Sequence, residues 1–443
     1  MPAKSVRGHE EPQQALRQFL DTVPRTRRVL IGYSGGLDSH VLLHAVCACR
    51  DYRPDLELLA LHVDHGMQSA SGDWGNHCRN ICRELDIPIE ILPTSVAADS
   101  GKGPEASARI ARYEQFAAKM RDSDYLLLAQ HADDQAETFL LQALRGSGPD
   151  GLASIPRKRS FSGGWLCRPL LGLARERLAD YAAFHDLRWI EDPSNDDVNL
   201  DRNFLRHEVL PLLQQRWPSL NQTLARSASR CGAASQLLKS LAQEDLALVS
   251  HADKQSLDIP MLLSLGQERV FNVLRLWVRE AGYVLPRLQD LRQVESALLQ
   301  ARADSAGVVQ VTNYEFRRFR QSLYLLPPQT EVEAFVYEWL PPYDDLSLPA
   351  LNLTLTRAAC AAQGLELPQA EPIRVQSRAG GELIRIGDPA FHKSVKKLLQ
   401  ESGIPPWRRD RLPLLYIGGR LAAVWQVIVA NDFKLETHKV SAV

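Results

Sequence analysis

The sequence lacks the features that mark membrane and secreted proteins. No apolar run is long enough to cross a bilayer. The first residues, MPAKSVRGHEEPQQALRQFL, contain no apolar core of a secretory signal and instead predict a helix that begins near Glu11. The seven cysteines are scattered and include no Cys-x-x-Cys pair, which is typical of reduced thiols rather than of a disulfide framework. These absences predict a cytoplasmic protein with no membrane partner.

A strong overall charge is also absent. The net charge of −1 argues against a generic polyanion binder, and the hydrophobic share of 45% is ordinary for a globular protein. The charge is unevenly distributed, however. From Glu371 to the end, twelve Lys and Arg face seven Asp and Glu, after an acidic stretch that contains proline, TEVEAFVYEWLPPYDDLSLP. A basic terminal region of this kind indicates a local surface for an anionic partner.

The first half of the chain alternates between strand and helix patterns. Predicted strands include VLIGYS, LELLALHV, IPIEIL and DYLLLAQ, and each is followed by a helical pattern such as DSHVLLHAVCACR or DDQAETFLLQALRG. This alternation predicts an α/β fold with a parallel, doubly wound sheet that binds its ligand at the carboxyl ends of the strands. A mainly helical middle region ending in a small sheet and a small α+β C-terminal domain follow. We predict domains at 1–217 and 218–327, a linker at 328–370, and a basic C-terminal domain at 371–443.

The stretch YSGGLDS directly follows the first predicted strand. Gly35 and Gly36 would let the backbone approach phosphate oxygens, and the next helix would offer unpaired N–H groups. No Lys follows the glycines, as a Walker loop requires, and Asp38 stands where such a loop would avoid negative charge. Taken alone, a glycine pair before a helix is equally typical of a tight structural turn.

Two further stretches carry clustered charge. HADDQAET contains Asp133, Asp134 and Glu137, of which Asp133 and Glu137 are four residues apart and share a helix face. Arg202 and Arg206 are also four apart, and Arg can grip phosphate through two N–H groups. The simpler alternatives are a solvated helix start for the acids, and surface ion pairs with Asp201 or Glu208 for the arginines.

The string SGGLDS resembles the ATP loop of the N-type ATP pyrophosphatases, which release pyrophosphate and form an adenylate. LHVDHGMQ, HADDQAET and EDPSNDDVNLDRNFLRHEVLP together resemble the bacterial tRNA(Ile)-lysidine synthetases. PEASARIARY, RGSGPDGL, CRPLL and the tail segment KKLLQESGIPPWRRDRLPLLY extend the resemblance over nearly the whole chain. Met67 and Gln68 depart from the Leu-Arg expected there, which puts a basic side chain at that place in doubt.

The resemblance implies an adenine nucleotide hydrolase-like fold and a ligase that uses ATP and Mg²⁺. It also implies that 1–217 is the catalytic PP-loop ATPase domain, and that 218–327 and 371–443 bind tRNA. Its partners would be free L-lysine and the isoleucine tRNA with the anticodon CAU. The oxygen on carbon 2 of the wobble cytidine, position 34, would be adenylated, and the lysine ε-amine would displace AMP to give lysidine. Decoding and aminoacylation would change from methionine to isoleucine. Because an amine of pKa about 10.4 is free in only roughly one molecule in 2,500 at pH 7, carboxylates are needed to bind and deprotonate it.

The resemblance also implies roles for individual residues. The catalytic candidates are Asp38, which is also the candidate Mg²⁺ ligand, Asp133, Glu137 and Arg206. The ATP-binding candidates are Ser34, Gly35, Gly36, Leu37, Asp38, Ser39, His62 and Asp64, with His65 beside them. The candidates for binding lysine or tRNA are Arg109, Arg112, Asp134, Arg202, Lys396, Lys397, Arg408 and Arg409.

Several alternatives stay open at this point. His62 could be a core histidine, and Arg109, Arg112 and the basic tail could be solvated faces. A tRNA 2-thiolation enzyme would need a persulfide cysteine or a Cys-x-x-Cys pair, and a small-molecule synthetase would not need a basic tail. A non-catalytic tRNA-binding protein would not need Asp38 and the carboxylates. The choice of general base, and whether the protein forms a homodimer, are both left undecided.

Overall fold

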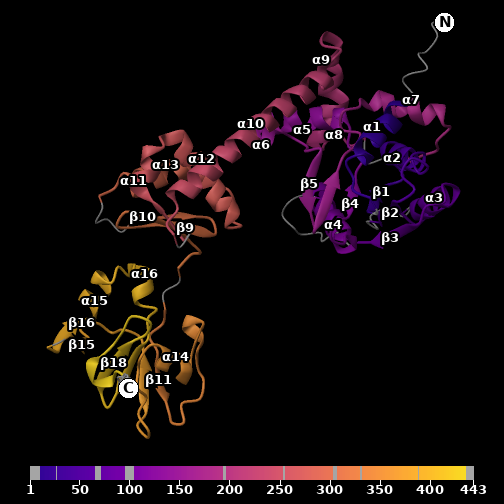
Figure 1. Ribbon diagram of the computed structural model, residues 1–443. Coiled ribbons are helices and arrows are strands. Elements are labelled where there is room, and N and C mark those ends of the chain that lie inside the picture. The colour runs from indigo at the N-terminus through magenta and orange to yellow at the C-terminus, as the bar shows by residue number, and fades with distance from the viewer. Residues whose placement is uncertain are drawn as a thin grey trace, which may run out of the picture. The chain divides into compact units, whose positions relative to one another are not determined.

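The computed structural model describes residues 10–25, 27–64, 71–94, 104–192, 196–252, 255–302, 307–329, 332–387 and 389–435, without the side chains of 71–73 and 104–106. The chain forms two compact units, Met1–Ser240 and Leu241–Val443 (Figure 1). Within the described ranges, none of the helices combines the length and apolar character that crossing a bilayer requires.

The first unit is built on a six-stranded sheet with the order β3-β2-β1-β4-β6-β5. Its strands are β1 Arg28–Gly32, β2 Glu57–Asp64, β3 Ile89–Pro93, β4 Tyr125–Leu127, β5 Lys158–Phe161 and β6 Gly164–Cys167. All neighbours are parallel except β5 and β6, which form an antiparallel hairpin at one edge. The predicted parallel α/β fold is confirmed.

The sheet is covered on both faces because its strands alternate. Val29 and Ile31 of β1 lie in one buried cluster, and Leu30 lies in another. The first cluster includes residues of α1 Glu11–Leu20, α2 Leu37–Cys47, α3 Ser71–Glu84 and α7 Arg175–Phe184, and the second includes residues of α4 Pro104–Lys119. α5 Ala132–Leu144 follows β4, and α6 Pro149–Leu152 precedes the hairpin. This arrangement brings the carboxyl ends of β1, β2 and β4 to one edge.

The β5–β6 hairpin was not predicted from the sequence. Phe161 pairs with Gly164, so the turn consists of Ser162 and Gly163, which have positive φ angles of 46° and 77°. A two-residue turn with both φ angles positive is the type I′ turn that matches the twist of antiparallel strands. The dipeptide Ser162-Gly163 was therefore the signal in the sequence for this hairpin.

One helical stretch after the sheet contains a wide turn. α8 Asp201–Phe204 continues through a π-helical turn, Leu205–Val209, into α9 Leu210–Arg216. The amide of Leu210 bonds to the carbonyl of Leu205, five residues back. Pro211 explains the widening, because proline has no N–H to give and its ring would clash with the carbonyl four residues earlier.

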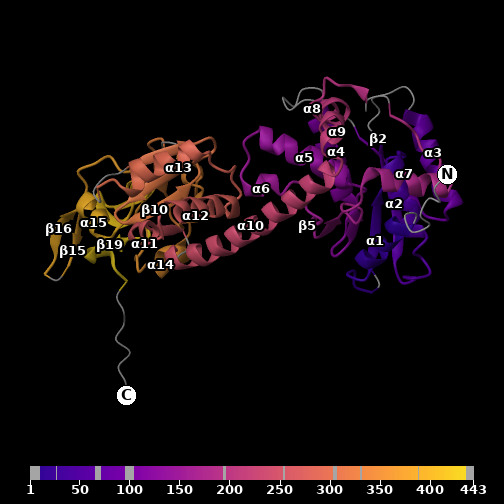
Figure 2. The same ribbon diagram turned by 90° about the horizontal axis from the view of Figure 1, so that it is seen from above.

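α10 Leu220–Val249 is the longest helix, and it runs across the residue that divides the two units (Figure 2). In the second unit, β7 Ser256–Asp258, β8 Val308–Val311, β9 Tyr314–Phe319 and β10 Ser322–Leu326 form an antiparallel sheet in the order β7-β10-β9-β8. One buried cluster includes residues of this sheet and of three helices, α11 Ile259–Ser264, α12 Gln267–Glu280 and α13 Leu288–Val294. The predicted helix-rich region ending in a small sheet is confirmed.

The C-terminal part contains a five-stranded antiparallel sheet, formed by β11 Val336–Trp339, β14 Ile373–Gln376, β17 Leu414–Ile417, β18 Arg420–Val424 and β19 Ile428–Val429. The hairpins β12 Leu346–Leu348 with β13 Leu353–Leu355, and β15 Leu383–Ile386 with β16 Phe391–Ser394, accompany it. So do the helices α14 Arg357–Ala362, α15 Val395–Glu401 and α16 Pro406–Arg409.

The structure differs here from the predicted linker at 328–370. β11 pairs with β14, and Trp339 and Tyr343 are buried in the same cluster as Ile373. The acidic, proline-containing composition suggested a connector, but the apolar residues of this stretch complete the C-terminal core. The folded C-terminal region therefore begins at β11.

Candidate active site

A cavity of about 700 Å³ opens at the carboxyl ends of β1, β2 and β4. The start of α2, one face of α4, the start of α5 and the π-helical turn form its walls. It brings together eleven of the residues predicted to bind or react: Ser34, Gly36, Leu37, Asp38, Ser39, His62, Asp64, Arg109, Arg112, Asp134 and Arg206. Residues drawn from five separate sequence segments thus meet in one hollow.

The loop before α2 has the conformation that a phosphate-binding turn needs. Gly35 has a φ of +86°, and a Cβ added there would lie 3.1 Å from the sulfur of Cys78, so both the backbone and the space favour glycine. The Oγ atoms of Ser34 and Ser39 are 3.0 Å apart, and Ser39 Oγ donates to the carbonyl of Gly36 at 2.9 Å. No described side chain caps the start of α2, which leaves its first N–H groups available to an anion.

Asp38 lies in the first turn of α2 and is about one-third exposed. Its Oδ2 atom is 3.5 Å from His131 Nε2, and its Oδ1 atom is 3.8 Å from Arg175 Nε. Oδ1 is buried and has no hydrogen-bond partner among the described residues. A carboxylate oxygen with no donor is suited to a cation or a substrate proton.

Mg²⁺ fits this arrangement only together with a nucleotide. In the described ranges, no group of three or more His, Cys, Asp or Glu side chains is placed to hold a metal ion. Mg²⁺ in phosphate-transfer sites is commonly held by one or two carboxylates and the substrate phosphates. Asp38 would supply the carboxylate, and the adjacent loop would place the phosphates beside it.

His131 was not predicted as a site residue, yet it joins two of the predicted ones. It is the N-cap of α5, and its Nδ1 atom accepts from the amide of Asp133 at 3.3 Å, so we infer that Nε2 carries the proton. Nε2 lies 3.5 Å from carboxylate oxygens of both Asp38 and Asp134. Burial alone would lower the pKa of His131, but the carboxylates of Asp38, Asp134 and Asp133 raise it above its ordinary value. The signal for His131 was its position at the start of HADD.

The buried Glu137 holds two half-buried arginines, Arg202 and Arg206. Glu137 is 1% exposed, and its two oxygens accept from Arg202 Nε and Arg206 Nε, each at 2.6 Å. Arg202 Nη2 also donates to Asp134 at 2.6 Å. The arginines are therefore held by acids that lie 65 to 69 residues earlier in the chain, and not by Asp201 or Glu208. Of these four residues, only Asp134 and Arg206 line the cavity.

Asp134 faces the cavity with its charge stabilised. Burial alone would raise the pKa of its carboxyl, but His131, Arg202, the amide of His131 and Arg206 together hold it below the ordinary value. Asp133, in contrast, does not line the cavity, and its Oδ1 is 3.5 Å from the amide of Arg175. Between these two neighbours, Asp134 is the carboxylate positioned to meet a ligand.

His62 is both a cavity-lining residue and a core histidine, which were the two alternatives left open by the sequence. Its ring is 4% exposed and lines the cavity, and its Nδ1 atom is 2.9 Å from the carbonyl of Tyr33. Burial lowers the pKa of His62, which favours the neutral ring. It therefore packs under the loop as a core histidine does. His65, Met67 and Gln68 lie outside the described residues.

The predicted basic residues of the tail lie in the second unit. Lys396 and Lys397 are exposed on α15, and Arg408 donates to Gln255 at 2.9 Å. Arg409 donates from Nε to the carbonyl of Ile404 at 2.8 Å. These four side chains belong to a different unit from the cavity.

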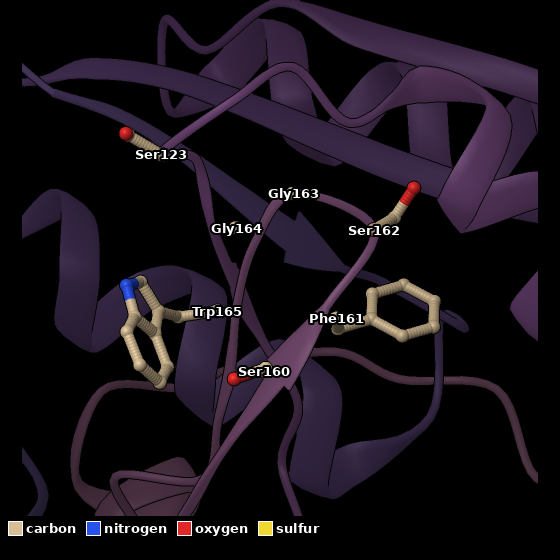
Figure 3. A pocket seen from close by; sticks show the side chains of 7 residues that line it. All are labelled: Ser123, Ser160, Phe161, Ser162, Gly163, Gly164 and Trp165. Carbon is tan, nitrogen blue, oxygen red and sulfur yellow. The ribbon is translucent and has the colours of Figure 1, made fainter. Parts of the chain in front are cut away.

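A second hollow, of about 530 Å³, lies beside the β5–β6 hairpin (Figure 3). Its lining residues are Ser123 and 160–165, none of which is charged. Figure 3 shows the rings of Phe161 and Trp165 on opposite sides of the hairpin. Because the larger cavity is lined by acidic and basic side chains as well, we place the candidate active site there.

Three segments of the chain match models of known protein families. Residues 9–213 match the family model of the PP-loop domain, 257–324 match the TilS substrate binding domain, and 373–442 match the TilS substrate C-terminal domain. The tRNA(Ile)-lysidine synthase of Serratia proteamaculans is 41% identical over 407 residues, which are 91% of this chain and 92% of that protein. This chain belongs to the tRNA(Ile)-lysidine synthase family.

Other tRNA(Ile)-lysidine synthases show similarity of the same extent. The protein of Xanthomonas campestris pv. campestris is 42% identical over 404 residues, which are 91% of both chains. The protein of Coxiella burnetii is 38% identical over 422 residues, covering 95% of this chain and 93% of that protein. The family predicted from the sequence motifs is confirmed, and the segment matching the PP-loop domain contains every residue that lines the cavity.

Proposed function

We propose that this chain uses ATP to join free L-lysine to carbon 2 of the wobble cytidine of the CAU-anticodon isoleucine tRNA. The cytidine is first adenylated, and the lysine amine then displaces AMP to give lysidine. The observation that carries the proposal is the single cavity in which the loop 34–39 lies with Asp134 and Arg206. Adenylation needs a phosphate-binding loop, and the attack of an ammonium-derived amine needs a carboxylate, and both are present.

The loop and the residues around it account for the first step. The N–H groups at the start of α2 and the hydroxyls of Ser34 and Ser39 would bind the phosphates of ATP. Mg²⁺, when bound at Asp38, would offset the charge of the departing pyrophosphate. Arg175, 3.8 Å from Asp38, would hold the Asp38 carboxylate and add positive charge on the same side.

The second step requires a lysine amine that has lost its proton. Asp134 lines the cavity and is ionised, so it would bind the ε-ammonium, take up its proton and leave the free amine facing the activated base. Glu137 would act from behind by fixing Arg206, whose guanidinium borders the same space. We therefore assign substrate contact to Asp134 and Arg206, and assign Glu137, Arg202 and His131 as positioning residues.

The partners follow from the same proposal. The target base lies in an anticodon loop and is already unpaired, so its entry into the cavity costs little free energy. A single cytidine does not distinguish one tRNA from the others. The exposed cations Lys396, Lys397 and Arg408 of the second unit would contribute a further contact with the tRNA backbone. A cytoplasmic location and homodimer formation remain predictions.

The test is a reconstituted reaction with ATP, L-lysine and an unmodified CAU tRNA(Ile) transcript. We expect AMP, pyrophosphate and lysidine in the nucleoside digest, and no lysidine when L-lysine is omitted. Asp38→Asn should slow AMP formation by about a hundredfold or more, because a preorganised charge at the reacting centre is removed. Asp86→Asn, whose carboxyl is fully exposed, is the matched control and should react at the normal rate. ATP turnover with sulfur or ammonia entering the base would contradict the proposal.

A further inference from the structure

Three arginines beside the cavity have no carboxylate partner among the residues that the structure describes. Arg109, Arg159 and Arg168, which we call the unpaired arginines, form no ion pair with any described residue. Arg109 and Arg159 instead lie over the ring of Tyr113, with their Cζ atoms 5.2 and 5.4 Å from its centroid. An aromatic face attracts a cation but carries no net charge, so the ring does not neutralise the two guanidinium groups.

Arg168 adds a third positive charge to the same place. It is 3% exposed and donates to the side chain of Gln130 at 2.6 Å and to the carbonyl of Pro156 at 2.7 Å, both neutral acceptors. Burial lowers the pKa of Arg168; Tyr113 acts in the opposite direction, and the neighbouring Arg159 and Arg109 lower it further. With no counterion in the described part of the chain, these like charges repel one another, and an external anion would relieve that repulsion.

The unpaired arginines extend from the cavity to the exposed edge strand β5. Arg109 and Tyr113 line the cavity, one turn apart on α4. Arg159 does not line it, but stands exposed on the edge strand β5, where it also lies 5.5 Å from the ring of Phe161. A ligand that touches both Arg109 and Arg159 has to extend beyond the cavity, which suits a polymer with repeated negative charges better than ATP or lysine.

The two faces of the β5–β6 hairpin differ in whether they adjoin the cavity. Residues 158 and 159 are adjacent on a strand, so their side chains point to opposite faces. Lys158 lies over the ring of Trp165, 4.2 Å from its centroid, whereas Arg159 lies over Tyr113 on the α4 side. Figure 3 shows Phe161 and Trp165 on these two opposite sides. Only the face of Arg159 is continuous with the cavity.

We propose that Arg159 binds a backbone phosphate of the tRNA close to the nucleotide that enters the cavity, so that the β5–β6 hairpin forms the outer part of the tRNA path. This inference rests on the proposed function, since it needs an RNA whose base is held at the loop 34–39. Arg109 and Arg168 keep the local potential positive on the way out. The other explanation for basic residues on an edge strand is protection against edge-to-edge aggregation, which Lys158 would serve equally well.

The experiment measures binding of the CAU tRNA(Ile) transcript to the full chain at several KCl concentrations. Loss of one phosphate contact with a single strand should reduce the slope of log K against log salt by about 0.7, or weaken binding about fourfold near 0.15 M salt. We expect this for Arg159→Ala and a smaller loss for Arg159→Lys. Lys158→Ala is the matched control and should keep both the slope and the affinity. ATP affinity without tRNA should stay normal in all three variants.

Two results would overturn the inference. An unchanged slope and affinity in Arg159→Ala would show that no phosphate is bound there, and equal losses in Arg159→Ala and Lys158→Ala would show a diffuse surface field instead of a path. Thermal unfolding of each variant checks that the hairpin is still folded. If the unaltered chain forms lysidine while Arg159→Ala binds tRNA normally, the inference fails and the proposed function stands. If the unaltered chain forms no lysidine, the proposed function itself fails.

Discussion

Two groups of arginines lie beside the cavity, and they differ in whether carboxylates of the protein neutralise their charge. Arg202 and Arg206 are held by the buried carboxylates of Glu137 and Asp134. The unpaired arginines, Arg109, Arg159 and Arg168, contact aromatic rings and neutral oxygens. The first group is neutralised within the protein and so has a fixed geometry. The second group leaves its charge for an external anion.

The largest effect is expected from breaking the neutralised group. Glu137→Gln would leave Asp134 as the remaining described carboxylate beside two partly exposed guanidinium groups, and breaking a fully buried ion pair costs about 3–5 kcal/mol, so we expect a loss toward the lower end of that range. Urea unfolding followed by circular dichroism should show this loss in the transition of the first unit. The exposed Glu114→Gln on α4 is the control and should change stability little. A loss below about 1 kcal/mol for Glu137→Gln would mean that the arginines find other acceptors.

The loop at the start of α2 should respond less strongly. Gly35→Ala would place a side chain at a φ of +86° and 3.1 Å from the sulfur of Cys78, at a cost of about 1–2 kcal/mol. Gly36→Ala is a close control for stability, because Gly36 has a φ of −81° and its added Cβ would meet nothing closer than 3.6 Å. Thermal unfolding of the two variants side by side tests the difference. Equal stability of both would contradict the conformational argument.

The contribution of His131 should depend on pH. Because its pKa is raised in the folded protein, the stability that its charged form provides is complete below its unfolded pKa of about 6.5, and is lost as the pH rises through the folded value. His131→Asn keeps an N-cap side chain but cannot be charged. The stability difference between the two proteins should therefore shrink as the pH rises above about 6.5. The effect should be modest, because the carboxylate contacts are long, at 3.5 Å. A difference that is constant from pH 5 to 9 would contradict it.

The smallest effect is expected in the unpaired group. Tyr113→Leu removes the ring over which Arg109 and Arg159 lie, and a cation–π contact at an exposed site is worth about 0.5–1 kcal/mol. Tyr113→Phe keeps the ring and should retain most of that stability. Added KCl should reduce the loss in the leucine variant, because it screens the repulsion between the arginines. A loss that grows with salt would mean that the arginines do not repel one another.

The sequence was sufficient for features set by neighbouring residues. The strand and helix alternation predicted the parallel sheet, and SGGLDS placed a glycine turn before α2, where Gly35 has a positive φ. HADDQAET likewise placed its acids at a helix start, with His131 and Asp134 capping it. These features depend on spacings of a few residues, which a sequence displays directly.

Features that depend on contacts between distant parts of the chain could not be predicted from the sequence. Arg202 and Arg206 were expected to contact phosphate or nearby acids, because nothing local shows that Glu137 lies beside them in the fold. Arg159 could not be connected with Arg109 for the same reason, since only the hairpin brings the two over Tyr113. The sequence shows charge but does not show which charges are neutralised, and that distinction separates the two arginine groups.

The π-helical turn at Leu205–Val209 is in effect an α-helix with one additional residue. The helical phase of the segment before the turn is therefore independent of the phase of the segment after it. Arg202 and Arg206 can keep their position on Glu137 while α9 presents a different face to its surroundings. A relative that lacks one residue between 207 and 209 would regain a continuous α-helix, and α9 would then present a different face while the two arginines stay four residues apart on the carboxylate. Sequence alignments of this family should therefore treat a gap between 207 and 209 as a change in the orientation of α9, and not as a neutral change in length.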